Sequence, residues 1–227
     1  MEEVLFDLSD EYRQMLHQGI RLSGENQEFF IHGRMESLVS RLPADFVVRR
    51  ILDFGCGIGT ATGLLAERFP HAEVIGVDTS ANALDYAQAH YGSDRVRFLC
   101  LTQLAQEGDF DLCYINGVFH HIEPASRTGA VENIHRALRS GGRLALFENN
   151  PWNPGTRMVM SRIPFDRDAI TLSPPEAKQL VRAGGFTKPA VSWSLFYFPR
   201  PLAFLRFTES ALSHLPLGAQ YCVLAAK

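Results

Sequence analysis

The chain has 227 residues, a formal net charge of −3 at neutral pH, 46% hydrophobic residues and 21% charged residues. These values are ordinary for a globular protein, so they exclude a wholly disordered chain, and the length suits one well-buried domain rather than two independent enzymes. The slight negative charge argues against a nucleic-acid partner, because binding to phosphate backbones needs clustered positive charge.

The cysteines and the amino-terminal sequence bear on the compartment. Cys56, Cys100, Cys113 and Cys222 show neither CxxC nor disulfide-like spacing, which suits a reducing environment and gives no zinc motif. The first residues, MEEVLFDLSDEY, lack the basic start and the apolar run of a signal peptide. No stretch approaches ~20 uninterrupted apolar residues. The sequence therefore predicts a cytoplasmic protein without a transmembrane segment.

Residues 1–45 precede the first strand and have helical periodicity in two segments separated by Gly24. Tyr12 lies on the apolar face of the first segment, and Phe29 and Phe30 lie in the second. These segments are expected to pack on the rest of the domain.

The stretch from Arg50 to Asp78, RILDFGCGIGTATGLLAERFPHAEVIGVD, predicts a strand, a glycine loop, a helix and a second strand. Gly55, Gly57 and Gly59 let the backbone turn tightly and approach a ligand without interference from a Cβ atom. The second strand ends in Asp78, whose carboxylate is placed to meet a ribose.

Two classes of ligand compete for such a unit. A dinucleotide fingerprint has a third glycine at the position that Thr60 occupies, and it places a pyrophosphate at the helix N-terminus. Asp53, at the end of the first strand, would repel a pyrophosphate. S-adenosylmethionine has no phosphate and carries a sulfonium and an ammonium group, so an acidic residue beside the loop favours this ligand.

The rest of the chain continues the alternation of strands and helices, which predicts a parallel sheet with right-handed crossovers. The predicted helices after Asp78 cover residues 81–91, 125–138 and 175–182, with a further helical segment over 199–215. The predicted strands are 96–101, 110–116, 143–148, 191–198 and 221–225.

The motif LDFGCGIGT followed by VIGVD resembles motifs I and II of the class I S-adenosylmethionine-dependent methyltransferases. The resemblance implies an α/β fold: a doubly wound, seven-stranded, mostly parallel sheet with an antiparallel last strand. It also implies an N-terminal helical lid over residues 1–45, a methyltransferase domain over 46–227, methyltransferase activity and S-adenosylmethionine as the cofactor.

The same resemblance assigns the cofactor residues. It implies that the methionine part is held around the first strand by Asp53, Gly55, Cys56, Gly57 and Gly59. Asp78, followed by Thr79, matches the acidic residue that binds the ribose hydroxyls, and Asn116 ends the fourth strand beside them.

The third strand departs from the family pattern. Where the family usually carries an acidic residue that receives the adenine amino group, this chain has Leu101, Thr102 and Gln103. Adenine recognition is then expected to depend on a backbone carbonyl, on Thr102 or Gln103, or on apolar contact with Leu101.

The segment after the fourth strand supplies the candidate catalytic residues. Phe119, His120 and His121 follow the carboxyl end of that strand, where sheets of this kind bind ligands. His121 or His120 is the predicted general base, because imidazole titrates near neutral pH; the alternative is that these histidines pack into the fold. Glu148, at the end of the fifth strand, is the second candidate. Only Glu148, Asn149 and Asn150 cluster as oxygen ligands, so no metal is predicted.

Residues 149–175 form a long segment rich in proline, glycine and arginine, which predicts a functional substrate loop. Trp152 and Arg157 are predicted to contact substrate together with Phe119 and Tyr12, a guanidinium being suited to bind anions. The alternative for Arg157 and Arg162 is a bridge to Asp166 and Asp168.

These observations predict methyl transfer to a small-molecule acceptor that is anionic or hydrophobic, foremost O-methylation of a hydroxyl or carboxyl group. One alternative is C-methylation of a hydrophobic enol or quinol. Another is a weakly active, cofactor-binding interaction protein, whose apolar segment 195–215 forms a homodimer or a peripheral membrane contact. A nicotinamide-dependent oxidoreductase is the third alternative, which Asp53 and Thr60 both oppose.

Overall fold

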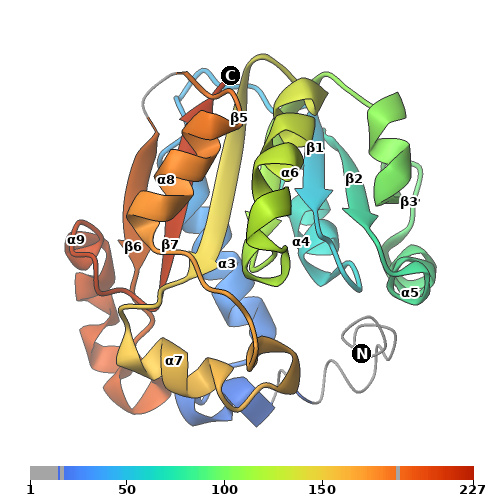
Figure 1. Cartoon of the computed structure of the whole chain (residues 1–227). Helices are drawn as coiled ribbons and strands as arrows, with labels where there is room; N and C mark the ends of the chain where they lie inside the picture. The colour runs from blue at the N-terminus through green and yellow to red at the C-terminus, as the bar shows by residue number, and fades with distance from the viewer. Residues whose placement is uncertain (1–14, 16–17, 188–189) are drawn as a thin grey trace.

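The structure is a computed structural model, and it describes residues 15, 18–187 and 190–227. Its centre is a seven-stranded sheet with the strand order β3-β2-β1-β4-β5-β7-β6 (Figure 1). The strands are β1 (Arg50–Phe54), β2 (Glu73–Asp78), β3 (Val96–Cys100), β4 (Phe110–Asn116), β5 (Leu138–Asn149), β6 (Val191–Leu195) and β7 (Gln220–Ala226). β7 runs antiparallel to both β5 and β6, and the other pairings are parallel. The predicted fold class is therefore confirmed.

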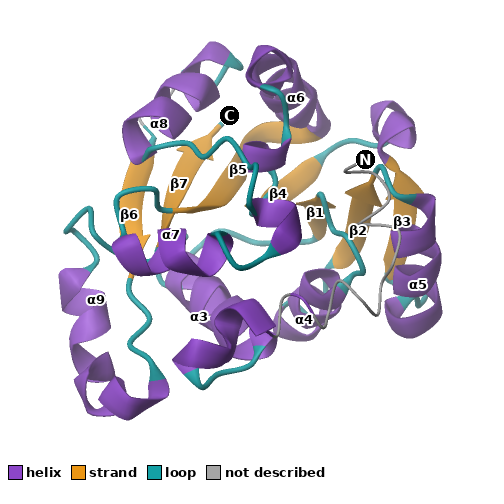
Figure 2. Ribbon diagram, turned by 60° about the horizontal axis from the view of Figure 1, so that its bottom comes forward, coloured by secondary structure: helices purple, strands orange, loops and turns teal. Residues whose placement is uncertain are grey.

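Helices cover both faces of the sheet, so each face is buried in an apolar layer (Figures 1 and 2). The α-helices are α3 (Gln27–Val39), α4 (Thr60–Arg68), α5 (Ala81–Tyr91), α6 (Pro124–Ala137), α7 (Pro154–Met160), α8 (Pro174–Ala183) and α9 (Glu209–Leu212). Short 3₁₀ helices are η1 (Arg21–Ser23), η2 (Leu101–Gln106), η3 (Phe119–His121), η4 (Pro164–Asp166) and η5 (Arg200–Thr208). Within the described residues, no helix combines the length and apolar character needed to cross a bilayer.

The two apolar layers are built from different helices. On one face, α6 and α8 bury Val131, Ile134 and Val181 against the sheet. On the other face, α3 buries Met35 and Leu38 in the same layer as α4. α3 is thus packed directly on the sheet, and other residues of the same helix remain available to a cavity.

The strand register brings the site together. In the parallel pairing of β4 with β5, Asn116 lies opposite Phe147, so Glu148 follows one residue beyond the end of that pair. Asp53 and Asp78 stand at or beside the carboxyl ends of β1 and β2, at the same edge of the sheet. α7 lies across this edge, below the strands in Figure 1 and in front of them in Figure 2.

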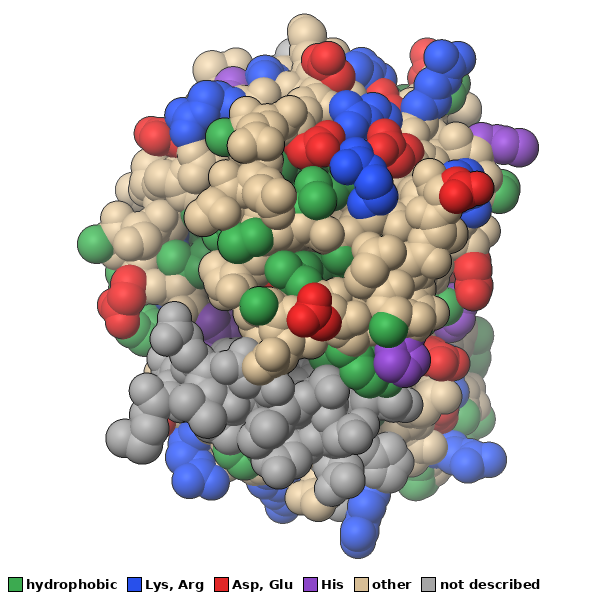
Figure 3. Space-filling model, turned by 90° about the vertical axis from the view of Figure 1, so that its right-hand side faces the viewer, with side chains coloured by type: hydrophobic (Ala, Val, Ile, Leu, Met, Phe, Trp, Pro, Cys, Tyr) green, Lys and Arg blue, Asp and Glu red, His purple; other side chains and the backbone are tan. Residues whose placement is uncertain are grey.

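At the opposite ends of these strands, charged side chains form a network. Arg50 binds Glu73 and Glu107, and Arg97 binds the same two carboxylates, all at distances from 2.9 to 3.2 Å. The face in Figure 3 accordingly shows basic and acidic side chains side by side in its upper part. The network links β1, β2 and β3 to the loop before β4.

Several predicted elements have different bounds in the structure. β5 begins at Leu138 rather than at Arg143, so residues 138–142 are strand. β6 stops at Leu195 rather than at Phe198, and residues 196–198 leave the sheet to line a cavity. The predicted helix over 199–215 is divided into η5 and α9, with a non-helical residue at Leu202. Pro199 is the N-cap of η5 and Pro201 lies in its first turn, where proline is tolerated because the first N–H groups of a helix have no partner within it.

Candidate functional site

A cavity of about 1580 Å³ opens at the carboxyl ends of the parallel strands. Its walls come from the glycine loop after β1, the end of β2, the segment after β4, the face of α3, residues 149–166, and residues 196–199 and 219–220. This volume exceeds the range of about 300 to 1,000 Å³ that is typical of a single ligand site. The cavity therefore has room for a cofactor and an acceptor together.

The glycine loop has the conformation that its sequence predicts. Gly55, Gly57 and Gly59 have φ values of 74°, 51° and 81°, which residues with a Cβ atom rarely adopt. The backbone N–H groups of Gly55 and Cys56 donate to the Val77 carbonyl at 2.8 and 3.0 Å, so the loop is fixed to β2.

Two glycines of this loop differ in their surroundings. A Cβ atom at Gly59 would lie 2.8 Å from the Cβ atom of Ala87 and 2.9 Å from the Phe98 ring, so this glycine allows α4 and α5 to pack. A Cβ atom at Gly57 would meet no atom of residues 15, 18–187 or 190–227 within 4 Å, and Gly57 lines the cavity. The missing side chain at Gly57 therefore leaves space for a ligand, whereas the one at Gly59 leaves space for neighbouring side chains of the protein.

Asp78 organises the loop from the end of β2. One carboxylate oxygen accepts the Gly57 N–H at 2.8 Å, and the other accepts the N–H groups of Thr79 and Ser80 at 2.7 and 3.0 Å. The carboxylate lines the cavity and is only partly buried. A carboxylate has about four acceptor sites. Three of them are used, so Asp78 can still accept one hydroxyl group from a ligand, through the oxygen that is hydrogen-bonded to Gly57.

Asp53 is buried beneath the glycine loop, at 2% exposure. Burial raises the pKa of its carboxyl to about 7, and the nearby Asp78 charge acts in the same direction, while the Thr62 hydroxyl, which donates to it at 2.6 Å, partly opposes the shift. Asp53 and Cys56 line a second hollow of about 70 Å³ rather than the main cavity.

Asn116 and Arg34 face both hollows. The Oδ1 atom of Asn116 is buried and has no hydrogen-bond partner among the described residues. Buried acceptors without a partner are rare and call for a donor. Arg34, on α3, donates to the Tyr114 hydroxyl at 3.0 Å and to the Gln220 side chain at 2.9 Å. This end of the cavity thus offers an acceptor for an ammonium group and a cation for a carboxylate.

The three side chains that are candidates for adenine recognition differ in their position relative to the cavity. Leu101 lines the cavity, whereas Thr102 and Gln103 are exposed and do not line it. The Gln103 amide oxygen accepts the Cys100 N–H at 2.9 Å, and the Thr102 hydroxyl is directed to the Cys100 sulfur at 3.2 Å. Leu101 is the one whose side chain could contact an adenine ring.

Glu148 and His120 form a buried pair at the other end of the cavity. Glu148 accepts the backbone N–H groups of Val118 and Phe119 at 3.1 and 2.7 Å through one oxygen, and His120 Nδ1 lies 2.6 Å from the other. The two side chains are 1% and 2% exposed. Glu148 therefore fixes both the η3 backbone and the orientation of the His120 ring.

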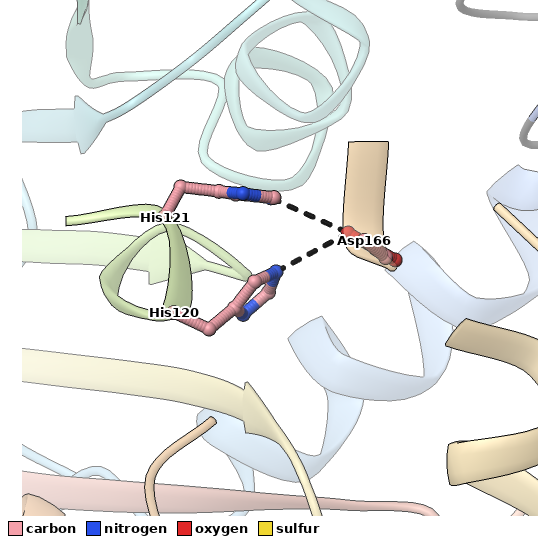
Figure 4. Close-up of side chains that lie close together, drawn as sticks. All are labelled: His120, His121 and Asp166. Atoms are coloured by element: carbon pink, nitrogen blue, oxygen red, sulfur yellow. Dashed lines mark ion pairs between the residues drawn. The ribbon is translucent and has the colours of Figure 1, made fainter. Parts of the chain in front are cut away.

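Asp166 lies beside the two histidines and faces both rings, as Figure 4 shows. Its Oδ1 atom is 3.4 Å from His120 Nε2 and 3.3 Å from His121 Nε2. His120 is buried and His121 is partly exposed, and all three residues line the cavity. Asp166 thus contacts the histidines, and not the arginines that the sequence had suggested as its partners.

The charges in this cluster shift one another's protonation. Burial by itself would lower the pKa of His120, but the Glu148 and Asp166 carboxylates outweigh it and raise this pKa to about 10. Burial would raise the pKa of Asp166, but its bonds to the two histidines hold it below the usual value. At neutral pH the structure therefore holds a cationic His120 between two carboxylates.

The predicted substrate residues are distributed unevenly. Tyr12 lies outside the described residues. Phe119 is fully buried, with its ring 6.4 Å from that of Phe54, and it does not line the cavity. Trp152 and Arg157 are exposed and do not line it either. The loop that carries them does contribute, through residues such as Val159 and Phe165.

Sequence reasoning missed two residues that the structure places in the cavity. Asp166 was considered only as a partner for arginine, and Arg34 lies in a helix assigned to packing. Arg34 interrupts the apolar face that Ile31, Met35 and Leu38 form, which is a detectable signal because a charged side chain is seldom buried without a partner.

Known proteins resemble this chain in sequence over its central part. Residues 51–142 match the family model described as a methyltransferase domain. A trans-aconitate 2-methyltransferase of Rhodopseudomonas palustris is 30% identical over 129 residues, which cover 57% of this chain and 49% of that protein. A malonyl-[acyl-carrier protein] O-methyltransferase of Priestia megaterium is 30% identical over 111 residues, covering 47% and 40%. The chain thus spans about half the length of such curated relatives or less.

Solved structures share the fold over more of the chain. A SAM-dependent methyltransferase from Archaeoglobus fulgidus has a TM-score of 0.67 at 16% identity, covering 89% of this chain and 95% of that one. A phosphoethanolamine N-methyltransferase 2 from Haemonchus contortus, solved in complex with S-adenosyl-L-methionine, has a TM-score of 0.67 at 15% identity, covering 100% and 60%. At these identities the likeness concerns the fold alone.

Proposed function

We propose that this chain, which carries a methyltransferase domain of the S-adenosylmethionine-dependent class over residues 51–142, transfers the cofactor's methyl group to an oxygen atom of a small-molecule acceptor. When bound, the cofactor supplies a methyl group already activated by the adjacent sulfonium. The protein then mainly aligns the acceptor with this group, a proximity effect worth roughly 7 to 11 kcal/mol.

The residues at the glycine loop fit this cofactor. Asp78 offers one acceptor site to a ribose hydroxyl, and Leu101 offers an apolar surface to adenine. The unpaired Asn116 Oδ1 atom suits the ammonium group, and Arg34 suits the carboxylate of the methionine part. The open space beside Gly57 is the observation that carries the proposal, because a bound ligand explains why no other group fills it.

Acidic groups around the cavity also favour a cationic cofactor. Asp53 and Asp78 stand at the glycine loop, where the ammonium and sulfonium groups would be attracted to them. A dinucleotide would bring two phosphate charges to the same place. This is why a nicotinamide cofactor is disfavoured.

A carboxylate is the acceptor that we favour. A carboxylate is already ionised at neutral pH and needs no base, whereas a hydroxyl group must lose a proton. The acceptors named for the trans-aconitate and malonyl-[acyl-carrier protein] enzymes are carboxylic acids, which supports this class. If a hydroxyl is the acceptor instead, His121 is better placed as base than His120, which is already protonated.

The reaction can be tested with a panel of acceptors. Formation of S-adenosylhomocysteine is measured with di- and tricarboxylates, aliphatic and aromatic hydroxyl compounds, and quinols. We expect turnover with carboxylates to exceed turnover with the other two classes. Turnover confined to quinols, with the methyl group found on a ring carbon of the product, would support C-methylation instead.

A second candidate function follows from the carboxyl-terminal surface. Phe204 and Phe207 are 69% and 81% exposed on η5, which favours contact with a second copy or a lipid surface. The mass in solution and binding to liposomes test this candidate, and a monomer that ignores lipid would remove it. The cytoplasm remains our prediction for the location, since the four cysteines are unpaired.

A further inference from the structure

The cluster of His120, His121 and Asp166 does more than hold the fold together. The two histidines are consecutive in η3, and their ring centroids lie 4.2 Å apart. Both Nε2 atoms are directed to one oxygen of Asp166, which comes from η4 in a different part of the chain (Figure 4). One donor atom from each of the three residues lies within 4.8 Å of the others.

Two of the three distances within the cluster, those from the histidine nitrogens to Asp166, match the separation between ligands of one ion. A charged N–H group and a carboxylate usually approach to about 2.7 to 2.9 Å. Here the two nitrogen-to-oxygen distances are 3.4 and 3.3 Å. Ligands at the corners of a tetrahedron around zinc, each about 2.0 to 2.1 Å from the ion, lie about 3.3 to 3.4 Å apart.

Glu148 has the position of an outer partner to such a site. It lies 2.6 Å from Nδ1 of His120, so that Nε2 is the nitrogen that faces Asp166. Metal-binding histidines usually donate their second N–H group to a carboxylate, which fixes the ring. Glu148 is itself held by the backbone N–H groups of Val118 and Phe119.

We propose that His120, His121 and Asp166 bind a divalent transition-metal cation, with zinc as the first candidate, and leave one coordination position open to the cavity. The cation takes the place of the Nε2 proton that His120 carries in the metal-free protein, and this proton is released to solvent. Two nitrogen ligands and one carboxylate, with a free fourth position, form a donor set of the kind found at catalytic zinc sites. Magnesium and calcium are disfavoured, because they prefer oxygen ligands.

The open fourth coordination position of the proposed metal site could bind the acceptor. All three ligands line the same cavity as the glycine loop. A carboxylate or hydroxyl oxygen of an acceptor can take the fourth position, so the cation would orient the acceptor and offset its negative charge. This use depends on the proposed methyl transfer, but the binding of the cation itself does not.

Metal binding is tested on the full chain without cofactor or acceptor. The protein is freed of metal with a chelator and dialysed. One sample is then titrated calorimetrically with zinc chloride, and a second metal-free sample with magnesium chloride. We expect one zinc ion per chain and no comparable binding of magnesium. Cobalt provides a second readout, because visible absorption from a tetrahedral site reports the ligands directly.

Variants assign the ion to the cluster. His121→Ala and Asp166→Asn each remove one ligand, and Glu148→Gln removes the outer carboxylate. We expect Glu148→Gln to weaken zinc binding about 10- to 100-fold, and the two ligand variants to weaken it further. His71→Ala is the matched control, since His71 is exposed and lies outside the cluster; it should bind zinc as the wild type does.

Thermal denaturation of each variant shows whether it is folded, and Asp166→Asn preserves the size of the side chain should His121→Ala fail to fold. The proposal is overturned if the wild type binds no zinc, or if folded His121→Ala and Asp166→Asn proteins bind zinc like the wild type. Binding of S-adenosylhomocysteine, measured separately, distinguishes a failure of the metal site from a failure of the proposed function.

Discussion

The two ends of the cavity are built in different ways. The end at the glycine loop, where we propose that the cofactor binds, comes mainly from one continuous stretch. Its polar groups are hydrogen-bonded to nearby backbone, as Asp78 is to the N–H groups of Gly57 and Thr79. We call it the cofactor end, and the opposite, proposed acceptor site the acceptor end. The acceptor end joins His120 and His121 to Asp166, which lies beyond the region that matches the methyltransferase model.

The difference concerns how each end achieves specificity. A site made from one turn and two strand ends is fixed once the sheet forms, so many chains can share it. A site completed by a loop after β5 can vary without disturbing the sheet, because loops tolerate change better than core strands. We therefore expect substitutions at the cofactor end to affect ligand affinity or stability, and substitutions at the acceptor end to affect turnover.

The largest effects are expected within the glycine loop, where two neighbouring glycines have different roles. Gly59→Ala introduces backbone strain and a clash with Ala87 and Phe98, which together should lower the free energy of unfolding by about 2 to 5 kcal/mol. Gly57→Ala introduces only the strain, about 1 to 2 kcal/mol, but its methyl group enters the cavity. Urea denaturation and cofactor titration of both variants should separate the two roles; equal cofactor loss in folded forms of both would contradict them.

Asp53 should make stability depend on pH. Its pKa is raised from 3.8 to about 7 in the folded protein, so between these values the folded state binds the proton more tightly than the unfolded state. Its stabilising contribution is therefore present below pH 3.8 and is lost as pH rises to about 7, by roughly 1 kcal/mol per pH unit.

Asp53→Asn removes this titration. The free energy of unfolding of the variant minus that of the wild type, measured by urea denaturation in the absence of cofactor, should rise between about pH 4 and pH 7 and then level off. A difference that stays constant over this range would show that the Asp53 carboxyl is not perturbed.

Asp78→Ala tests the ribose contact. Loss of a charged hydrogen-bond acceptor should cost about 1.5 to 3 kcal/mol, which weakens cofactor affinity roughly ten- to a hundredfold. Asp85→Ala removes an exposed carboxylate from the neighbouring helix α5 and serves as the control. Equal affinities for the two variants, by calorimetry, would remove Asp78 from the cofactor site.

His121→Ala tests the acceptor end. Its loss should slow turnover about ten- to a hundredfold, as expected when a charged or metal-linked contact to the acceptor is removed. Cofactor affinity should remain near that of the wild type, because His121 is not part of the glycine loop. If the variant instead loses cofactor affinity with turnover per bound cofactor intact, the histidine has a structural role.

The smallest effect is expected at Arg157. This residue was predicted to bind substrate, yet it is exposed and does not line the cavity. Arg157→Ala should change stability by less than about 0.5 kcal/mol and leave steady-state kinetics near those of the wild type. A raised KM with unchanged kcat would instead show that Arg157 contributes to binding of the acceptor.

The fold could be predicted well from the sequence, because its signals are local. β4 has the predicted bounds, Phe110–Asn116, and α4 begins directly after the glycine loop. Pro124, Pro154 and Pro174 begin α6, α7 and α8, and Gly92 and Gly184 follow α5 and α8. Prediction was weaker over residues 199–215, where the sequence favours one helix but the structure has η5, with a non-helical residue at Leu202, followed by α9.

The acceptor end could not be predicted to the same depth. His120 and His121 were identified because they follow a strand end, but their contact with Asp166 depends on how residues 149–166 return over the sheet. The periodicity of apolar residues does not predict the path of such a loop. No metal was predicted, because in the sequence only Glu148, Asn149 and Asn150 cluster as oxygen ligands. The group of His120, His121 and Asp166 could not be recognised in this way, because only the folded chain brings these residues together.

Calorimetric titration of the purified wild-type chain with S-adenosylhomocysteine, after removal of any cofactor carried through purification, tests the central claim most directly. The account predicts saturable binding of one molecule per chain, which is weakened in Gly57→Ala while that variant remains folded. No binding to the folded wild type, or equal binding to Gly57→Ala, would contradict the assignment of the glycine loop as the cofactor site.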